Sequence, residues 1–200
     1  ADDYARSLYL RGLVQVANQM YKSAVQSFQQ SILAQESNDS DVRIAYLAYM
    51  ALARIAYETG DYDASIFYYR KVPQASLQLP VAFYESGWSF FVKGDFSRAL
   101  GTFHALHSPY FAHYFYPELW ILEATIYLNM CHYEYAKDAI SMFRNHVSVL
   151  GVPLAQFMQS MRTPAEYYMA LMKIIEGDRT YNMPETLLFP VLSNVEFYAL

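Results

Sequence analysis

The side chains best suited to bind a metal ion are four histidines and one cysteine in the middle of the chain. His104 and His107 are three residues apart, so on a helix both would face the same way and could reach one ion. His113, Cys131 and His132 follow. A zinc site needs about four such ligands in a tetrahedral arrangement, and this spacing matches no standard zinc module. The pattern therefore favours surface or packed histidines, and we expect neither a metal nor another cofactor.

The sequence also carries no recognisable catalytic motif. There is no Gly-rich phosphate loop, no His-Glu-x-x-His and no nucleophile elbow. Asp61, Asp63 and Asp95 fall where helices are expected to start, so capping and the helix dipole explain them. Glu85 and Glu123 belong to different repeats and are expected on different faces, so they predict no paired-carboxylate site. We therefore expect no enzyme activity.

Composition narrows the function classes further. Of the 200 residues 54% are hydrophobic and 18% aromatic, so the chain can bury a substantial core. The net charge of −5 gives no basic footprint for nucleic acid or anionic lipid. No apolar run reaches the roughly 18 residues that span a membrane. The chain starts at Ala1 without Met, which we interpret as a mature exported protein or a fragment of a longer one.

A pattern of small and large residues recurs four times and indicates the architecture. A small residue is followed twelve positions later by a second one, and a large residue comes four positions after that: Gly12/Ala24/Phe28, Ala53/Ser65/Tyr69, Gly87/Ala99/Phe103 and Ala124/Ala136/Ile140. Antiparallel helices approach closely only where residues without bulk sit at their crossing. The pattern therefore predicts four helix hairpins, in which each large residue fills the gap to the next repeat. The second small residues are 41, 34 and 37 positions apart, a period typical of a helical solenoid.

Hydrophobic periodicity and terminal signals locate the helices of these hairpins. We expect helices near 3–18, 21–35, 41–59, 62–72, 80–93, 96–107, 117–130 and 133–148. Gly60-Asp61 and Gly94-Asp95 each end one helix and open the next, and Ser40 is a plausible cap. Pro80 and Pro117 fit a first helical turn.

Residues 149–200 break the pattern, so we divide the chain into four hairpins at 1–148 and a divergent helical cap at 149–200. Thr163 and Glu166 form a capping box that opens a helix to about residue 175. A last helical piece should start at 184 and be stopped or kinked by Pro190. Because the end of the chain is apolar, we expect it to be covered by its own fold, by absent downstream residues or by self-association through 184–200.

The second and third hairpin turns, 60–69 and 94–100, resemble the tetratricopeptide-repeat (TPR) family, and the resemblance covers about residues 4–148. Asn18-Gln19-Met20 and Met130-Cys131-His132 depart from the usual Gly-Asp turn. The resemblance implies an all-α, right-handed solenoid whose first helices line a concave groove. By position, the predicted partner-binding residues of that groove include Tyr9, Leu13, Met50, Arg54, Tyr57, Tyr84, Trp88, Phe91 and Thr125.

This lining is aromatic and aliphatic with one cation, Arg54, and it lacks the Lys and Asn with which family members grip chaperone tails. It suits an amphipathic helix or an extended apolar peptide, so we expect a scaffold or adaptor that binds a protein or peptide. Two alternatives stay open: a peptide or small-ligand sensor whose C-terminal helices, such as 164–176, close over the groove, and a structural subunit that self-associates.

The segment 107–117 is unusually aromatic and joins two hairpins. We favour a wedge that packs between the third and fourth repeats over a partner patch. The runs 108–111 and 117–124, with 131–136, are weakly similar to bacterial envelope TPR proteins. That similarity implies a periplasmic assembly or motility adaptor, while a cytoplasmic location stays open.

Overall fold

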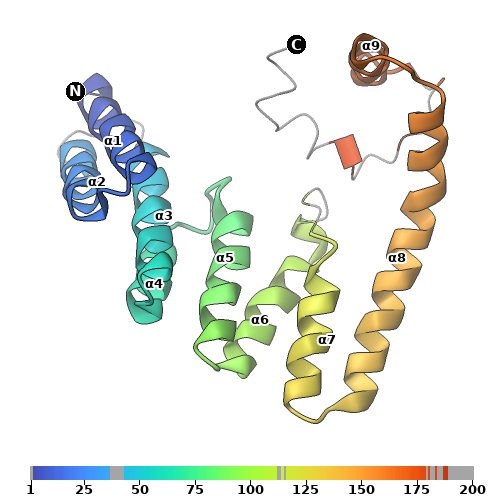
Figure 1. Ribbon diagram of the computed structural model, residues 1–200, viewed down its shortest axis with the longest axis horizontal. Coiled ribbons are helices and arrows are strands. Elements are labelled where there is room, and N and C mark those ends of the chain that lie inside the picture. The colour runs from blue at the N-terminus through green and yellow to red at the C-terminus, as the bar shows by residue number, and fades with distance from the viewer. Residues whose placement is uncertain are drawn as a thin grey trace. The chain divides into compact units, whose positions relative to one another are not determined.

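The structure is a computed structural model that describes residues 2–36, 43–111, 114, 116–178, 180, 183, 187 and 188. All the regular structure in these residues is helical. The chain forms two compact units, Ala1–Leu106 and His107–Leu200, which are described separately (Figure 1). The predicted cap at Ser40, His113 and nearly all of 184–200 lie outside the described residues. None of the described helices is both long and apolar enough to cross a membrane.

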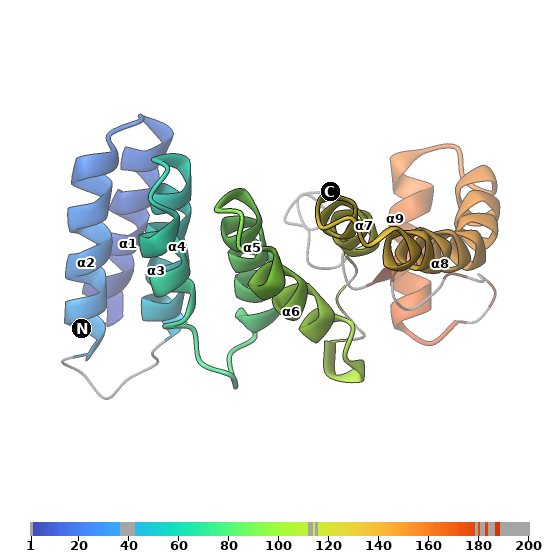
Figure 2. The same cartoon turned by 90° about the horizontal axis from the view of Figure 1, so that it is seen from below.

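The first unit consists of three antiparallel helix hairpins. They pair α1 (Asp2–Ala17) with α2 (Tyr21–Glu36), α3 (Arg43–Glu58) with α4 (Tyr62–Tyr69), and α5 (Leu79–Val92) with α6 (Phe96–Leu106). Successive hairpins pack through α2 on α3 and α4 on α5 (Figure 2). This arrangement confirms the predicted TPR-like solenoid of helix hairpins.

The small residues of the repeat are sites of close approach, as predicted. A methyl group on Gly12 would lie 2.5 Å from Cε1 of Phe28, and one on Gly87 would lie 2.2 Å from Cε1 of Phe103. Both phenylalanines are fully buried. In the first and third copies the large residue therefore packs on the first small residue of its own hairpin. Phe28 also joins a core cluster with Ala48 and other α3 residues, so it fills the gap to the next hairpin as well.

The four hairpin turns share one backbone conformation, although only two contain the expected glycine. Gly60 and Gly94 have φ of 80° and 81°, and Gln19 and Cys131 occupy the same place with φ of 60° and 59°. In each turn two backbone N–H groups bond back to the last helical turn, as in Cys131 N to Leu128 O at 3.1 Å. The departures from Gly-Asp therefore leave the turn geometry unchanged, but two L-residues adopt the left-handed region that glycine prefers.

The second unit contains a short 3₁₀ turn, η1 (Pro109–Phe111), then α7 (Leu119–Asn129), α8 (Tyr133–Gln159) and α9 (Pro164–Ile175). The helix predicted to end at 148 instead continues through Pro153 to Gln159, because Leu150 and Phe157 are buried and extend its apolar face. The division at 148 therefore falls inside α8, and it stays a prediction.

Of two other predicted features of this unit, the capping box of α9 is present and the buried large residue of the fourth repeat is not. The capping box is present: Glu166 N donates to the Thr163 hydroxyl, and Thr163 N donates to the Glu166 carboxylate. Ile140, the large residue of the fourth copy, is 40% exposed. The fourth hairpin therefore keeps the small residues Ala124 and Ala136 in its core but not the buried large residue.

Candidate functional site

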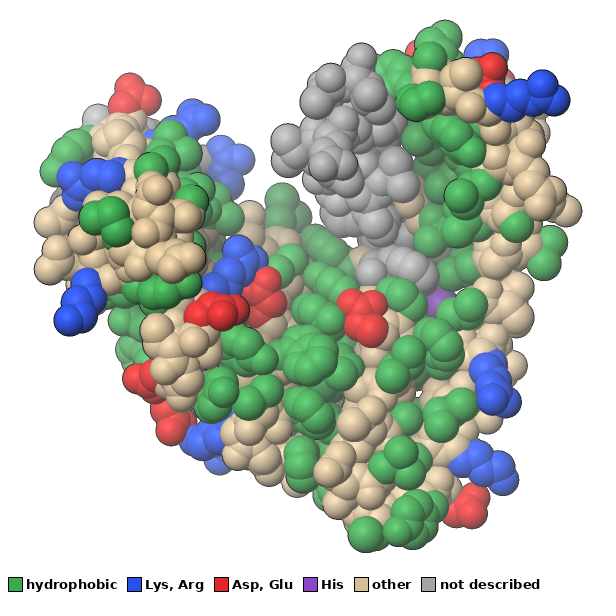
Figure 3. Space-filling view, viewed as in Figure 1, with side chains coloured by type: hydrophobic (Ala, Val, Ile, Leu, Met, Phe, Trp, Pro, Cys, Tyr) green, Lys and Arg blue, Asp and Glu red, His purple; other side chains and the backbone are tan. Residues whose placement is uncertain are grey.

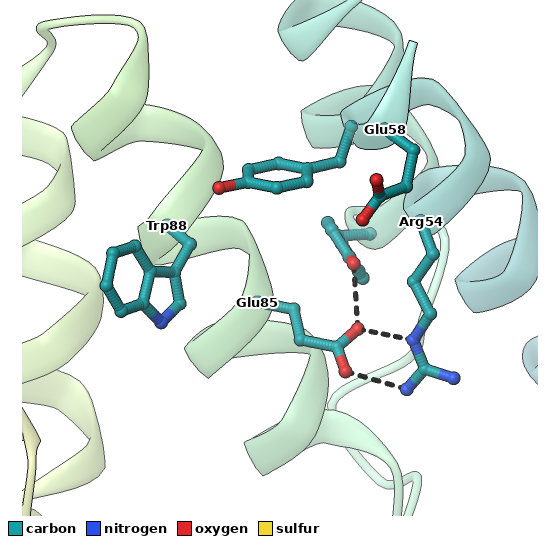
Figure 4. A pocket seen from close by; sticks show the side chains of 6 residues that line it. Arg54, Glu58, Glu85 and Trp88 are labelled. Atoms are coloured by element: carbon teal, nitrogen blue, oxygen red, sulfur yellow. Dashed lines mark hydrogen bonds and ion pairs between the residues drawn. The ribbon is translucent and has the colours of Figure 1, made fainter. Parts of the chain in front are cut away.

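The first unit contains an open pocket of about 390 Å³ formed by α3, α4 and α5. We call it the Trp88 pocket, and six side chains line it: Arg54, Tyr57, Glu58, Tyr69, Glu85 and Trp88 (Figure 4). It brings together three of the predicted partner-binding residues, Arg54, Tyr57 and Trp88. Its size lies in the range of about 300–1,000 Å³ that is usual for ligand sites.

A hydrogen-bonded ion pair forms the floor of this pocket. Arg54 Nε donates to Glu85 Oε2 at 2.8 Å, and Arg54 Nη2 donates to Oε1 at 2.7 Å. The Tyr69 hydroxyl also donates to Glu85 Oε2, at 2.7 Å. This two-bond geometry is the strongest that arginine makes with a carboxylate. The network ties the second hairpin to the third, and the one cation of the predicted groove already has a partner.

The electrostatics of the network favour its present protonation states. The hydrogen bonds that Arg54 donates to Glu85 raise the pKa of the Arg54 guanidinium, although burial opposes this shift. Burial, and then the Glu85 charge, raises the pKa of the Tyr69 phenol far above its usual value. Tyr69 is therefore a neutral hydrogen-bond donor at any physiological pH.

Glu58 is the remaining charged residue of the pocket and differs from Glu85. It is exposed, and it makes no hydrogen bond or ion pair with any residue that the structure describes. Figure 4 shows its carboxylate pointing into the pocket from the side of Arg54, with Trp88 on the opposite side and Glu85 between them. Burial, then the nearby charges of Tyr62 and Glu58, raises the pKa of Tyr57.

Aromatic side chains surround the charged groups. Trp88 and Tyr57 are half-buried, so part of each ring is accessible. Trp88 packs edge-on against Phe91, with ring centroids 5.7 Å apart, and Tyr57 packs in the same way against Tyr62 at 5.6 Å. Figure 3 shows oppositely charged side chains beside a continuous hydrophobic surface over α5. Each of the two rings therefore has an aromatic neighbour that supports its orientation.

The other predicted site residues of the first unit have different surroundings. Tyr9 lines a separate pocket between α1 and α3, and Leu13 on α1 is exposed. Tyr84 and Phe91 are half-buried on α5. Met50 is a correction: it is only 3% exposed and packs in a core cluster with buried residues of α4 and α5, so it cannot meet a partner. Its side chain is covered because the third hairpin closes over that face of α3.

In the second unit, Thr125 is half-buried and its hydroxyl donates to the Ile121 carbonyl within α7. Ile121 lines an apolar pocket with residues of α8 and with Leu187 from the C-terminal segment. α9 packs Ala170 and Leu171 on Phe157 and on other residues at its junction with α8. These apolar residues are therefore partly covered by the unit itself.

The histidine region contains a contact that the sequence analysis missed. His107 Nε2 lies 3.1 Å from Oε1 of Glu123, whose side chain is 4% exposed. The His107 ring stacks on Trp120 with centroids 4.8 Å apart, and Trp120 packs on His146 at 4.7 Å. Burial, and then the His107 charge, lowers the pKa of His146. The only available signal was the spacing of 16 residues between His107 and Glu123, which equals that of Gly12 and Phe28.

The described residues contain no group of three or more potential metal ligands. His107 instead interacts with Glu123 and Trp120, and Cys131 is exposed at a turn. The absence of a metal stays a prediction.

The family model of the tetratricopeptide repeat matches residues 46–72, which include most of α3 and all of α4. Residues 46–72 are therefore a tetratricopeptide repeat. The matched repeat contributes Arg54, Tyr57, Glu58 and Tyr69 to the Trp88 pocket. Comparison with curated proteins gives no match. TPR units are typically non-enzymatic interaction repeats, so the matched repeat supports a protein-interaction scaffold in general. The similarity to bacterial envelope members, and with it a periplasmic location, stays a prediction.

Proposed function

We propose that this protein is a non-enzymatic TPR scaffold or adaptor that binds a peptide segment of a partner protein across α3 and α5, at the Trp88 pocket. One observation carries the proposal: an open pocket combines half-exposed, pre-oriented aromatic rings with a hydrogen-bonded charge network. Tryptophan, tyrosine and arginine are enriched among the residues that dominate the energetics of protein interfaces, and the two aromatic residues bury much surface at a low cost in side-chain entropy.

The immobilisation of the pocket supports binding rather than a purely structural role. The Trp88–Phe91 contact and the Arg54–Glu85 bonds hold the lining side chains in place, so little ordering remains when a ligand binds. The adjoining surface of α5 offers apolar area beside the polar floor, and an extended or helical peptide uses both.

Selection from a displayed random-peptide library on the immobilised full-length chain tests this proposal. We expect selected peptides to bind the wild type and to lose affinity for Trp88→Ala and Tyr57→Ala, both accessible at the pocket. The aromatic control is Phe67→Ala, because Phe67 is 54% exposed on α4 and does not line the pocket. Failure to select any peptide, or selected peptides that bind all four proteins equally, would contradict the proposal.

Self-association is the second candidate function, because α8 exposes several large apolar side chains, among them Met142, Val149 and Val152. The predicted route through 184–200 remains a proposal. Sedimentation velocity of the full chain against a chain ending at 183 tests it: a mass that falls with dilution only in the full chain supports self-association through that segment.

A further inference from the structure

The charges in the Trp88 pocket do not balance. Arg54 and Glu85 neutralise each other through two N–H···O bonds of 2.8 and 2.7 Å. Glu58 is left, with no ion pair or hydrogen bond among the described residues. The pocket therefore carries one negative charge in excess, and two N–H groups of its own cation are already bonded to Glu85.

The position of Glu58 indicates that the fold itself gains nothing from this charge. Glu58 is the last residue of α3, where the unsatisfied carbonyls carry partial negative charge and a carboxylate is unfavourable. The side chain is exposed, so packing does not compensate for the repulsion. A positively charged group bound in the pocket would offset it.

The opposite side of the pocket also attracts a cation. The face of an indole ring carries negative electrostatic potential, and tryptophan is the best aromatic partner for ammonium and guanidinium groups. Trp88 lies across the pocket from Glu58 in Figure 4, with Glu85 between them. The pocket volume of about 390 Å³ leaves room for a long aliphatic side chain that ends in a charge.

We propose that the Trp88 pocket takes a lysine or arginine side chain of the bound peptide, with its cationic head between the Glu58 carboxylate and the Trp88 ring. The inference rests on the proposed peptide-binding function and adds the chemistry of the residue that the pocket selects. An acidic side chain or a peptide carboxylate is disfavoured, because it would meet Glu58 and an arginine that already has its partner.

Four synthetic peptides with identical apolar flanks and a central Lys, Arg, norleucine or Glu test the inference. The indole N–H signals of the ¹⁵N-labelled full-length chain report binding, because each unit contains one tryptophan. Trp88 senses the pocket, and Trp120 in the other unit is the internal reference. We expect the Lys and Arg peptides to shift the Trp88 signal with affinities about fivefold or more above that of the norleucine peptide, and the Glu peptide to bind most weakly.

The matched variants are Glu58→Gln, which removes only the excess charge, and Glu134→Gln on α8, whose carboxylate is 88% exposed in the other unit. The preference for Lys and Arg over norleucine should shrink in Glu58→Gln, where only the Trp88 ring still attracts the cation, and should persist unchanged in Glu134→Gln. If the norleucine peptide binds wild type as tightly as the Lys peptide, the inference is overturned while peptide binding stands. If none of the four peptides moves the Trp88 signal, the inference is also overturned, and the library selection separately decides the proposed function.

Discussion

A methyl group added at Gly87 tests the small-residue crossing that shapes the third hairpin. The Cβ of Gly87→Ala would lie 2.2 Å from Cε1 of Phe103 and 2.7 Å from its Cδ1 and Cζ. These separations are far below van der Waals contact, and the Phe103 ring is fully buried, so it can move only by displacing other core atoms. Overpacking costs about 1–3 kcal/mol, and this site belongs at the upper end of that range.

Two opposing effects set the net change. Alanine favours a helix interior over glycine by about 1 kcal/mol, which offsets part of the steric cost. We therefore expect Gly87→Ala to lower the free energy of unfolding by about 2 kcal/mol. Gly101→Ala on α6 is the matched control, because its added methyl group would meet no heavy atom within 4 Å apart from its chain neighbours and the backbone of its own helix. It should gain stability by up to about 1 kcal/mol.

Urea unfolding, followed by far-UV circular dichroism, gives both values from the midpoint and slope. A double variant, Gly87→Ala with Phe103→Leu, removes the ring atoms that clash, so the cost of the added methyl should shrink in that background. If Gly87→Ala proves as stable as Gly101→Ala, the two helices do not depend on this crossing, and the explanation of the repeat pattern is wrong.

The remaining predictions concern turns, a cap, pH and the pocket. Gln19→Gly and Cys131→Gly should each stabilise the chain by about 1 kcal/mol, because both residues have φ near 60°; Gly60→Ala, with φ of 80°, should destabilise it in the same urea assay. Thr163→Ala removes the capping box of α9 and should cost about 1 kcal/mol, with Ser141→Ala on α8 as a control. The pKa of His146 is lowered in the folded chain, so the contribution of neutral His146 to stability is complete above the unfolded pKa of about 6.5 and is lost as the pH falls through the folded pKa. His146→Gln should therefore reduce the fall in the free energy of unfolding at acid pH. An unchanged pH dependence would contradict the assignment to His146. Trp88→Ala should weaken binding of a selected peptide by about 1–3 kcal/mol without a matching loss of stability, whereas Phe67→Ala should not.

The sequence predicted the hairpins because their determinants are local. Gly12, Gly87 and their partner phenylalanines act through contacts at a fixed spacing, and the capping box of Thr163 is complete within four residues. The prediction that this helix ends at 148 was wrong. Gly151 and Pro153 are helix-breaking residues, but the burial of Leu150 and Phe157 stabilises the helix beyond them. Tertiary packing overrides local preference in such cases.

The candidate site was only partly predictable for the same reason. Position within the repeat predicted that Tyr57 and Trp88 line one groove, and in the structure both line the Trp88 pocket. Repeat position could not show that Glu85 from the next hairpin pairs with Arg54. Because this pair neutralises Arg54, the charge left in the pocket is the negative charge of Glu58. Met50 was misplaced because the third hairpin covers it, and repeat position alone carries no information on how closely neighbours pack.

Peptide binding at the Trp88 pocket is the central claim, and one calorimetric comparison tests it most directly. A peptide selected on the full-length wild-type chain is titrated into wild type and into Trp88→Ala at equal concentration, after both show the same circular dichroism and melting temperature. We predict a Kd at least about tenfold weaker for Trp88→Ala, equivalent to about 1.4 kcal/mol. Equal Kd values in two equally folded proteins would show that the peptide binds elsewhere and that the pocket is not the partner site.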